Sequence, residues 1–197
     1  MKRDESRYDG IGHLAEGNER QRSEHALLKR LQLMDRLAEF DPILVGTVPI
    51  DVDVPGSDLD IICEVRVAER FLEAVRKLFA DADVPIECVV RQVEDRERVV
   101  VRTHVDGWPI ELFGEPLPVK RQNGYRHMIV EARLLERMGR EGREAIRSLK
   151  AAGMKTEPAF ACYLGMNDGD PYVRLAALYE LGHDELLAAI ERGEVRR

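Results

Sequence analysis

Apolar residues in the first part of the chain recur at helical spacing in some stretches and at strand spacing in others. Over residues 17–39 they return every three or four positions among many charges, which predicts an amphipathic helix. Short apolar runs at 43–45 and 59–65 predict two strands, separated by a loop rich in Pro and Asp. A second amphipathic pattern over 67–82 predicts a helix that returns the chain after the second strand.

Three further strands are predicted at residues 86–93, 98–105 and 109–113. The last two are joined by Asp106-Gly107, a favoured pair for a tight hairpin turn. We therefore expect a mixed, mainly antiparallel sheet with helices on one side.

Beyond residue 121 no segment alternates like a strand, and the rest of the chain is predicted to be helical. An apolar stripe runs from Tyr125 to Met138, and shorter helices are expected at 141–152, 158–164, 171–181 and 184–192. The expected fold class is α+β. We expect a core over residues 1–117, with the N-terminal helix, and a helical subdomain over residues 118–197.

Composition narrows the function classes. The formal net charge of −7 argues against a broad electrostatic contact with nucleic acid, so a small-molecule or protein partner is expected. No apolar run reaches membrane-spanning length, and residues 1–19 lack the apolar stretch of a signal peptide. The 3 cysteines are widely spaced and odd in number, which favours reduced thiols and a cytoplasmic location.

Two acids at the start of one strand carry the clearest chemical signal. In the run from Asp58 to Ile62, alternation sends Asp58 and Asp60 to one face of the sheet and the apolar residues between them to the other. Carboxylates placed so closely repel each other unless a cation lies between them. Oxygen ligands suit Mg²⁺ or Mn²⁺, so a divalent metal site is expected here.

A third acid, Glu111, lies among apolar neighbours in the strand expected at 109–113. An unpaired carboxylate is costly in an interior strand. If this strand lies beside that of Asp58, Glu111 completes a cluster of three acids that can hold one or two metal ions.

These residues resemble the polymerase-beta-type nucleotidyltransferase superfamily. The resemblance rests on Gly46-Thr47 after an apolar strand, a loop ending at Ser57, Asp58-Leu59-Asp60-Ile61, and the later acid Glu111. More closely, these motifs, residues 122–127 and Lys155-Thr156-Glu157-Pro158 resemble a small bacterial family of unknown function within that superfamily.

The resemblance implies metal-dependent transfer of a nucleoside monophosphate from a nucleoside triphosphate to an acceptor. It implies that Gly46, Thr47 and Ser57 contact the triphosphate, and that Asp58, Asp60 and Glu111 hold the metal as catalytic residues. Thr47 departs from the commoner serine, keeping the hydroxyl but adding a methyl group.

Basic residues follow the Glu111 strand. Lys120, Arg121 and Arg126 open the next helix and are expected to offer charge to the triphosphate, although a solvated helix terminus remains an alternative. His127 and Glu131 are one helical turn apart, where they can orient each other.

Three alternatives remain. Asp51-Val52-Asp53 is another Asp-x-Asp pair, although it falls in a loop. The whole chain can also be a catalytically silent module of the same fold that binds a nucleotide or a protein, or an antitoxin-like regulatory protein. The sequence identifies neither the base nor the acceptor.

Overall fold

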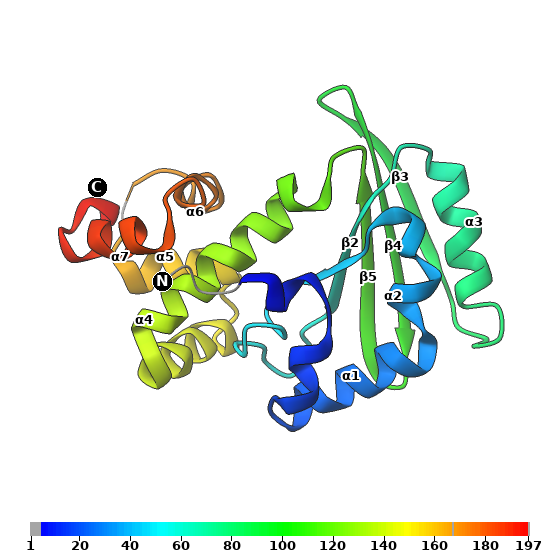
Figure 1. The fold of residues 1–197 in the computed structure, drawn as a ribbon, viewed down its shortest axis with the longest axis horizontal. Coiled ribbons are helices and arrows are strands. Elements are labelled where there is room, and N and C mark those ends of the chain that lie inside the picture. Colours follow the sequence, from blue (N-terminus) through cyan, green and yellow to red (C-terminus); the bar gives the residue numbers. More distant parts are fainter. Residues whose placement is uncertain (1–4, 167, 197) are drawn as a thin grey trace.

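A five-stranded mixed sheet forms the centre of the fold. The computed structural model describes residues 5–166 and 168–196, and the predicted domain ranges extend to residues 1–4, 167 and 197, which lie outside them. The strands lie in the order β1-β2-β5-β4-β3 (Figure 1), with β2 and β5 parallel and the other neighbours antiparallel. Their bounds are Ile43–Val45 (β1), Leu59–Glu64 (β2), Glu87–Val93 (β3), Arg96–Val105 (β4) and Trp108–Glu115 (β5). The α+β class and the mixed, mainly antiparallel sheet are confirmed.

Two tight turns connect the last three strands. Asp106 and Gly107 have φ values of 51° and 83°, as a type I′ hairpin requires, which confirms the predicted turn. Glu94 and Asp95 have φ values of 50° and 59° and make the corresponding turn between β3 and β4. Glutamate is not a usual residue for that turn, so the sequence signals it less clearly than Asp106-Gly107.

The N-terminal part of the fold is helical. Its elements are η1 (Glu5–Asp9), η2 (Gly12–Glu16), α1 (Glu19–Leu31), α2 (Leu33–Arg36) and η3 (Ala38–Phe40), and α3 (Ala68–Leu78) follows β2. Asn18 starts α1 through a reciprocal capping box with Gln21. The single helix expected over 17–39 is wrong in one respect, because Gln32 takes a left-handed conformation at φ 51° and separates α1 from α2.

One face of the sheet packs against these helices. Alternation along β2 places Leu59, Ile61 and Cys63 on that face, all fully buried in a core that also contains Phe71 and Val75 of α3. Figure 1 shows α1, α2 and α3 on this side of the sheet. Asp60 therefore points to the other face, as the alternation predicted.

The rest of the chain is a group of helices beside that second face. It contains η4 (Val119–Arg121), α4 (Asn123–Ala151), α5 (Thr156–Leu164), α6 (Pro171–Leu178), α7 (His183–Glu191) and η5 (Glu194–Arg196). Two helices were expected within the range of α4, and α4 is indeed kinked between them at Gly139, where φ is 65°. A second apolar core joins α4 to Ile43, Val45 and Ile62 of the sheet.

The helices therefore share a core with the sheet, and the division at residue 117 stays a prediction. Within the described residues, no helix is both long enough and apolar enough to span a bilayer.

Candidate functional site

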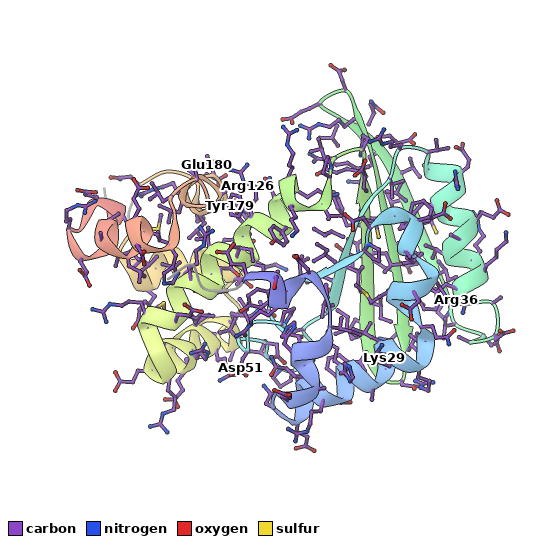
Figure 2. The ribbon with its side chains drawn as sticks, in the orientation of Figure 1. Lys29, Arg36, Asp51, Arg126, Tyr179 and Glu180 are labelled. Atoms are coloured by element: carbon purple, nitrogen blue, oxygen red, sulfur yellow. The ribbon has the colours of Figure 1, made fainter. Side chains whose placement is uncertain are left out.

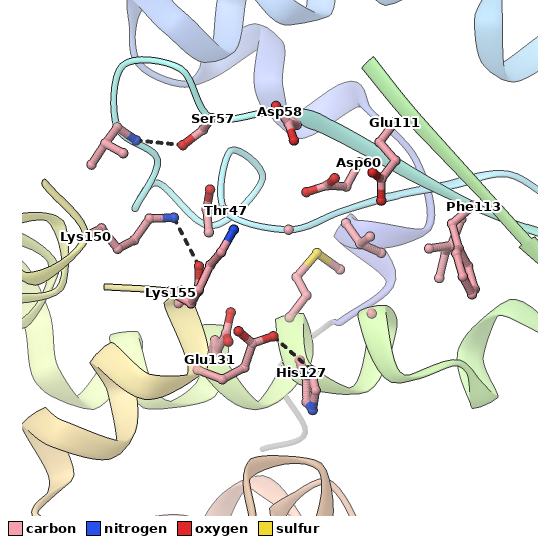
Figure 3. A pocket seen from close by; sticks show the side chains of 18 of the residues that line it. Thr47, Ser57, Asp58, Asp60, Glu111, Phe113, His127, Glu131, Lys150 and Lys155 are labelled. Atoms are coloured by element: carbon pink, nitrogen blue, oxygen red, sulfur yellow. Dashed lines mark hydrogen bonds and ion pairs between the residues drawn. The ribbon is translucent and has the colours of Figure 1, made fainter. Parts of the chain in front are cut away.

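Asp60 and Glu111 lie side by side on neighbouring strands. The parallel register of β2 and β5 pairs Asp60 with Glu111 directly, so both side chains project from the same face. Asp58 lies just before β2, and all three carboxyl groups border one pocket (Figure 3). The juxtaposition expected from sequence is therefore present, while the role of these acids as metal ligands stays a prediction.

The loop after β1 passes close over Asp60. Gly46 has a φ of 80°, and a β-carbon built on it would lie 2.5 Å from Oδ2 of Asp60. The backbone N–H of Val52 donates to the carbonyl of Thr47 over 3.1 Å, and the N–H of Val54 donates to Oγ of Ser57 over 3.0 Å. These bonds hold the loop in a fixed turn, with Thr47 and Ser57 both lining the pocket.

The acids are crowded. Burial, together with the nearby carboxylates of Glu111 and Asp58, raises the pKa of Asp60 to about 7, although the charge of Lys150 acts against this shift. Glu111 has a direct cationic partner, because Nη2 of Arg102 on β4 lies 2.6 Å from its Oε2. Glu111 therefore has an ion-pair partner, whereas the negative charge of Asp60 is disfavoured by its surroundings.

The donor set fits a hard divalent cation in part. Carboxylate oxygens at Asp58 and Asp60 are the ligands that Mg²⁺ or Mn²⁺ prefers. Within residues 5–166 and 168–196, however, no three His, Cys, Asp or Glu side chains are arranged closely enough to hold a metal ion. Glu111 would have to turn from Arg102 to act as a third ligand.

The pocket has a volume of about 650 Å³, within the range usual for small-molecule sites. The sheet supplies the acids and Phe113, the loop from Gly46 to Ser57 forms the rim, and α4 supplies Gly124, His127, Met128 and Glu131. Gly124 allows α4 to start close to the sheet, because a β-carbon there would lie 3.4 Å from both Ile62 and Val45.

The basic residues at the pocket are not those expected. Nζ of Lys120 pairs with Asp9 at 2.7 Å, and Arg126 pairs with Glu180 at 2.6 Å on the side of α4 that faces α6 (Figure 2). Arg121 is exposed and, like these two, does not line the pocket. The expectation that they border it is wrong, because the short η4 turn and the first turn of α4 direct their side chains elsewhere.

Lys150 and Lys155 line the pocket instead, near the end of α4 and the start of α5. Nζ of Lys150 donates to Oγ1 of Thr156 over 3.1 Å, and burial lowers the pKa of Lys150 while four nearby acids act against that shift. Arg98 also lines the pocket but is held 3.1 Å from Glu115. No periodicity or motif singled out Lys150, whereas Lys155 belongs to a recognised motif whose chemistry was unexplained.

His127 has a different partner from the one considered. Its Nδ1 lies 3.1 Å from Oε1 of Glu157, and its Nε2 lies 2.9 Å from the carbonyl of Tyr172. Two hydrogen-bonding partners therefore hold the ring of His127 at both of its nitrogens. Burial raises the pKa of Glu157, but its hydrogen bond with His127 and nearby cations outweigh burial and the net shift is downward. Pairing of His127 with Glu131 is therefore wrong.

The competing Asp51-Val52-Asp53 pair has structural partners. Asp51 accepts hydrogen bonds from Arg147 and Asn18, and Oδ2 of Asp53 lies 2.5 Å from Nε of Arg20. Their charges are compensated by the protein itself, and neither residue lines the pocket. The Asp-x-Asp at residues 58–60 is thus the better placed of the two.

One family of proteins matches a large part of the chain. The sequence pattern of a family described as "Domain of unknown function (DUF4269)" matches residues 26–178. No curated protein sequence matches the chain.

Three solved structures of Cid1 are similar in fold. One, described in terms of RNA terminal uridylyl transferase activity, has a TM-score of 0.52 at 11% identity, covering 76% of this chain and 49% of that chain. Cid1 with the UTP analogue UMPNPP has a TM-score of 0.51 at 13% identity, covering 83% and 55%. Cid1 poly(U) polymerase with magnesium and 3′-dATP has a TM-score of 0.51 at 13% identity, covering 80% and 48%. The fold is that of nucleotidyltransferases, and this chain spans about half the length of these structures.

Proposed function

This chain belongs to the DUF4269 family, and we propose that it transfers a nucleoside monophosphate from a nucleoside triphosphate to an acceptor, releasing pyrophosphate. The observation that carries the proposal is the pairing of Asp60 with Glu111 in parallel register beneath Gly46, at the edge of a pocket large enough for a nucleotide. The nucleotidyltransferase fold of the chain supports it.

In this proposal Asp58 and Asp60 hold Mg²⁺ or Mn²⁺, and Glu111 joins them after leaving Arg102. When bound, the metal neutralises charge that develops on the phosphates and aligns the attacking oxygen. The acceptor oxygen forms a bond to the α-phosphorus as the bond from that phosphorus to the bridging oxygen breaks. The carboxylate of Glu111 accepts the acceptor's proton, and pyrophosphate leaves.

The triphosphate is bound in the same pocket as the acids. Lys150 and Lys155 supply positive charge, and the hydroxyl of Thr47 lies in the same pocket. Gly46 and Ser57 contribute backbone and hydroxyl groups at the rim. This assignment replaces the cations Lys120, Arg121 and Arg126 with residues that border the pocket.

We propose a small molecule or a protein as the acceptor. The chain has a net charge of −7, and the arginines nearest the pocket on β4, Arg98 and Arg102, are engaged by Glu115 and Glu111. The similar Cid1 structure is described as an RNA terminal uridylyl transferase, so RNA belongs among the acceptors tested. The free cysteines Cys63, Cys88 and Cys162 support a reducing, cytoplasmic location.

One observation favours a second candidate, a catalytically silent module that binds a nucleotide or a protein. Arg102 forms an ion pair with the carboxylate of Glu111, and an ion pair of this kind can be purely structural. In such a module Asp58 and Asp60 would bind at most a structural ion, and no transfer would occur.

A labelling experiment separates the two. The protein is incubated with Mg²⁺ or Mn²⁺ and with each labelled nucleoside triphosphate in turn. The acceptor is supplied as a metabolite extract, a protein extract or RNA. Pyrophosphate and labelled product are then measured. Transfer should occur with the unaltered protein and with Asp81→Asn, an exposed acid outside the pocket. Asp60→Asn should keep the fold but lose transfer and metal-dependent nucleotide binding. Nucleotide binding without pyrophosphate release under any condition would favour the silent module.

A further inference from the structure

Glu131 is an acid that the proposed reaction does not use. It lies on α4, across the pocket from the sheet that carries Asp60 and Glu111 (Figure 3). Its side chain is almost completely buried, at 2% exposure, and its Oε1 has no hydrogen-bond partner in the described part of the protein. Burying a polar atom without a partner is destabilising, so a site that retains one invites a ligand that supplies the missing bond.

Two neighbouring polar groups on this wall already have partners within the protein. Glu157 is paired with His127, and Lys150 donates to Thr156. Among the described side chains that line the pocket, Oε1 of Glu131 is the buried polar atom left without a partner. Glu131 is therefore an open hydrogen-bonding group on this wall.

The charge state of Glu131 limits what can bind there. Burial raises its pKa well above the usual range, the charge of Glu157 raises it further, and Lys150 opposes both. The shift favours the protonated form of the carboxyl group, which offers one donor and one acceptor. A neutral carboxyl group offers no opposite charge to a phosphate, and the positive charge of Lys150 repels an ammonium group. A neutral, planar group with adjacent donor and acceptor atoms fits best.

We propose that Glu131 recognises the base of the nucleoside triphosphate by pairing with its hydrogen-bonding edge, an inference that rests on the proposed nucleotidyl transfer. Every base presents a donor beside an acceptor on that edge, at a position that differs from base to base, and a protonated carboxyl group can form two hydrogen bonds to such a pair. Met128 and Met154 line the same pocket and offer polarisable, apolar surface to the ring. Glu131 then sets base preference, while Lys150 and Lys155 bind the phosphates that all nucleotides share.

Two substitutions test this pairing. Glu131→Gln keeps one donor and one acceptor at the same place, whereas Glu131→Leu removes both at similar size. Affinities are measured for ATP, CTP, GTP and UTP with Mg²⁺, and for inorganic tripolyphosphate. Glu141→Gln is the matched control, because Glu141 is exposed on the same helix and lies outside the pocket.

The wild-type protein and the Glu131→Gln and Glu141→Gln variants should share one base preference. Glu131→Leu should bind the preferred nucleotide about tenfold or more weakly and level the four affinities, with tripolyphosphate binding unchanged. Melting curves establish that each variant is folded.

If Glu131→Leu keeps the wild-type preference, the inference is wrong while the proposed function stands. If Glu131→Gln loses the preference as fully as Glu131→Leu, pairing through a neutral acid is wrong. If the wild-type protein binds neither nucleotides nor tripolyphosphate, both proposals fail.

Discussion

The backbone of Gly46 lies directly against the carboxylate of Asp60. A β-carbon at position 46 would approach Oδ2 of Asp60 to 2.5 Å, which is closer than side-chain atoms pack. The φ of 80° at Gly46 is also one that other residues rarely adopt. Glycine is thus favoured here for two independent reasons, and the first links the loop to the acid at the centre of the proposed reaction.

Gly46→Ala should therefore damage both stability and ligand binding. The strained φ should cost about 1–3 kcal/mol of unfolding free energy, and the added methyl should displace the Asp60 side chain. Gly107→Ala is the control, because Gly107 has a φ of 83° but no atom within 4 Å of its added β-carbon. Thermal melting with and without Mg²⁺ and nucleotide should show destabilisation in both variants, with the ligand-induced increase lost only in Gly46→Ala. An equal ligand response in both would mean that the contact with Asp60 is irrelevant to binding.

The ion pair between Arg102 and Glu111 should compete with metal binding. Arg102→Gln should leave Glu111 free and tighten Mg²⁺ or Mn²⁺ binding by up to about fivefold, the equivalent of an exposed ion pair of 0.2–1 kcal/mol. Calorimetric titration measures this affinity directly. Arg91→Gln, an exposed arginine on β3, is the control and should bind metal like the unaltered protein. Unchanged or weaker metal binding in Arg102→Gln would show that Arg102 does not compete with the ion for Glu111.

The choice of phosphate-binding residues is also testable. Lys150→Met should weaken the binding of tripolyphosphate, measured with Mg²⁺ present, by about tenfold or more. The reason is that a charge-assisted hydrogen bond contributes roughly 1.5–3 kcal/mol. Lys120→Met should have no such effect, since Lys120 pairs with Asp9 outside the pocket. If Lys120→Met weakened binding and Lys150→Met did not, the phosphate-binding residues expected from sequence would be the correct ones.

Glu24 should make stability depend on pH. It is fully buried in α1, neither carboxyl oxygen has a hydrogen-bond partner in the described residues, and burial, with the charge of Asp53, raises its pKa from 4.5 to about 8. The folded protein holds this proton more tightly than the unfolded chain does. The resulting stabilisation is fully present below pH 4.5 and is lost as the pH rises through about 8.

Glu24→Gln removes this titration while keeping the shape of the side chain. Between pH 5 and pH 8.5 the unaltered protein should lose stability relative to Glu24→Gln, by an amount on the order of 4 kcal/mol. Urea denaturation at several pH values measures the difference. Glu19→Gln, an exposed position in the same helix, should track the unaltered protein. A constant difference between Glu24→Gln and the unaltered protein across this range would show that Glu24 is already ionised when folded.

Several features could be read from the sequence because they depend on local geometry. Alternation along one strand was enough to bury Leu59 and Ile61 and to turn Asp60 to the other face. The Asp106-Gly107 turn follows from residue types that tolerate positive φ. The break at Gln32 was missed, because glutamine has no local preference for the left-handed conformation that it adopts there.

The surroundings of the acids were decided by contacts between distant segments. Sequence placed Glu111 in an apolar strand, but only the packed sheet brought β5 beside β2 in the register that pairs it with Asp60. In the same way, Lys150 reaches the pocket and Lys120 does not, because the packing of α4 against Val45 and Ile62 sets which residues face the sheet. Local periodicity says which side of a helix is apolar. It does not determine which distant element that side will contact, since that depends on the packing free energy of the whole chain.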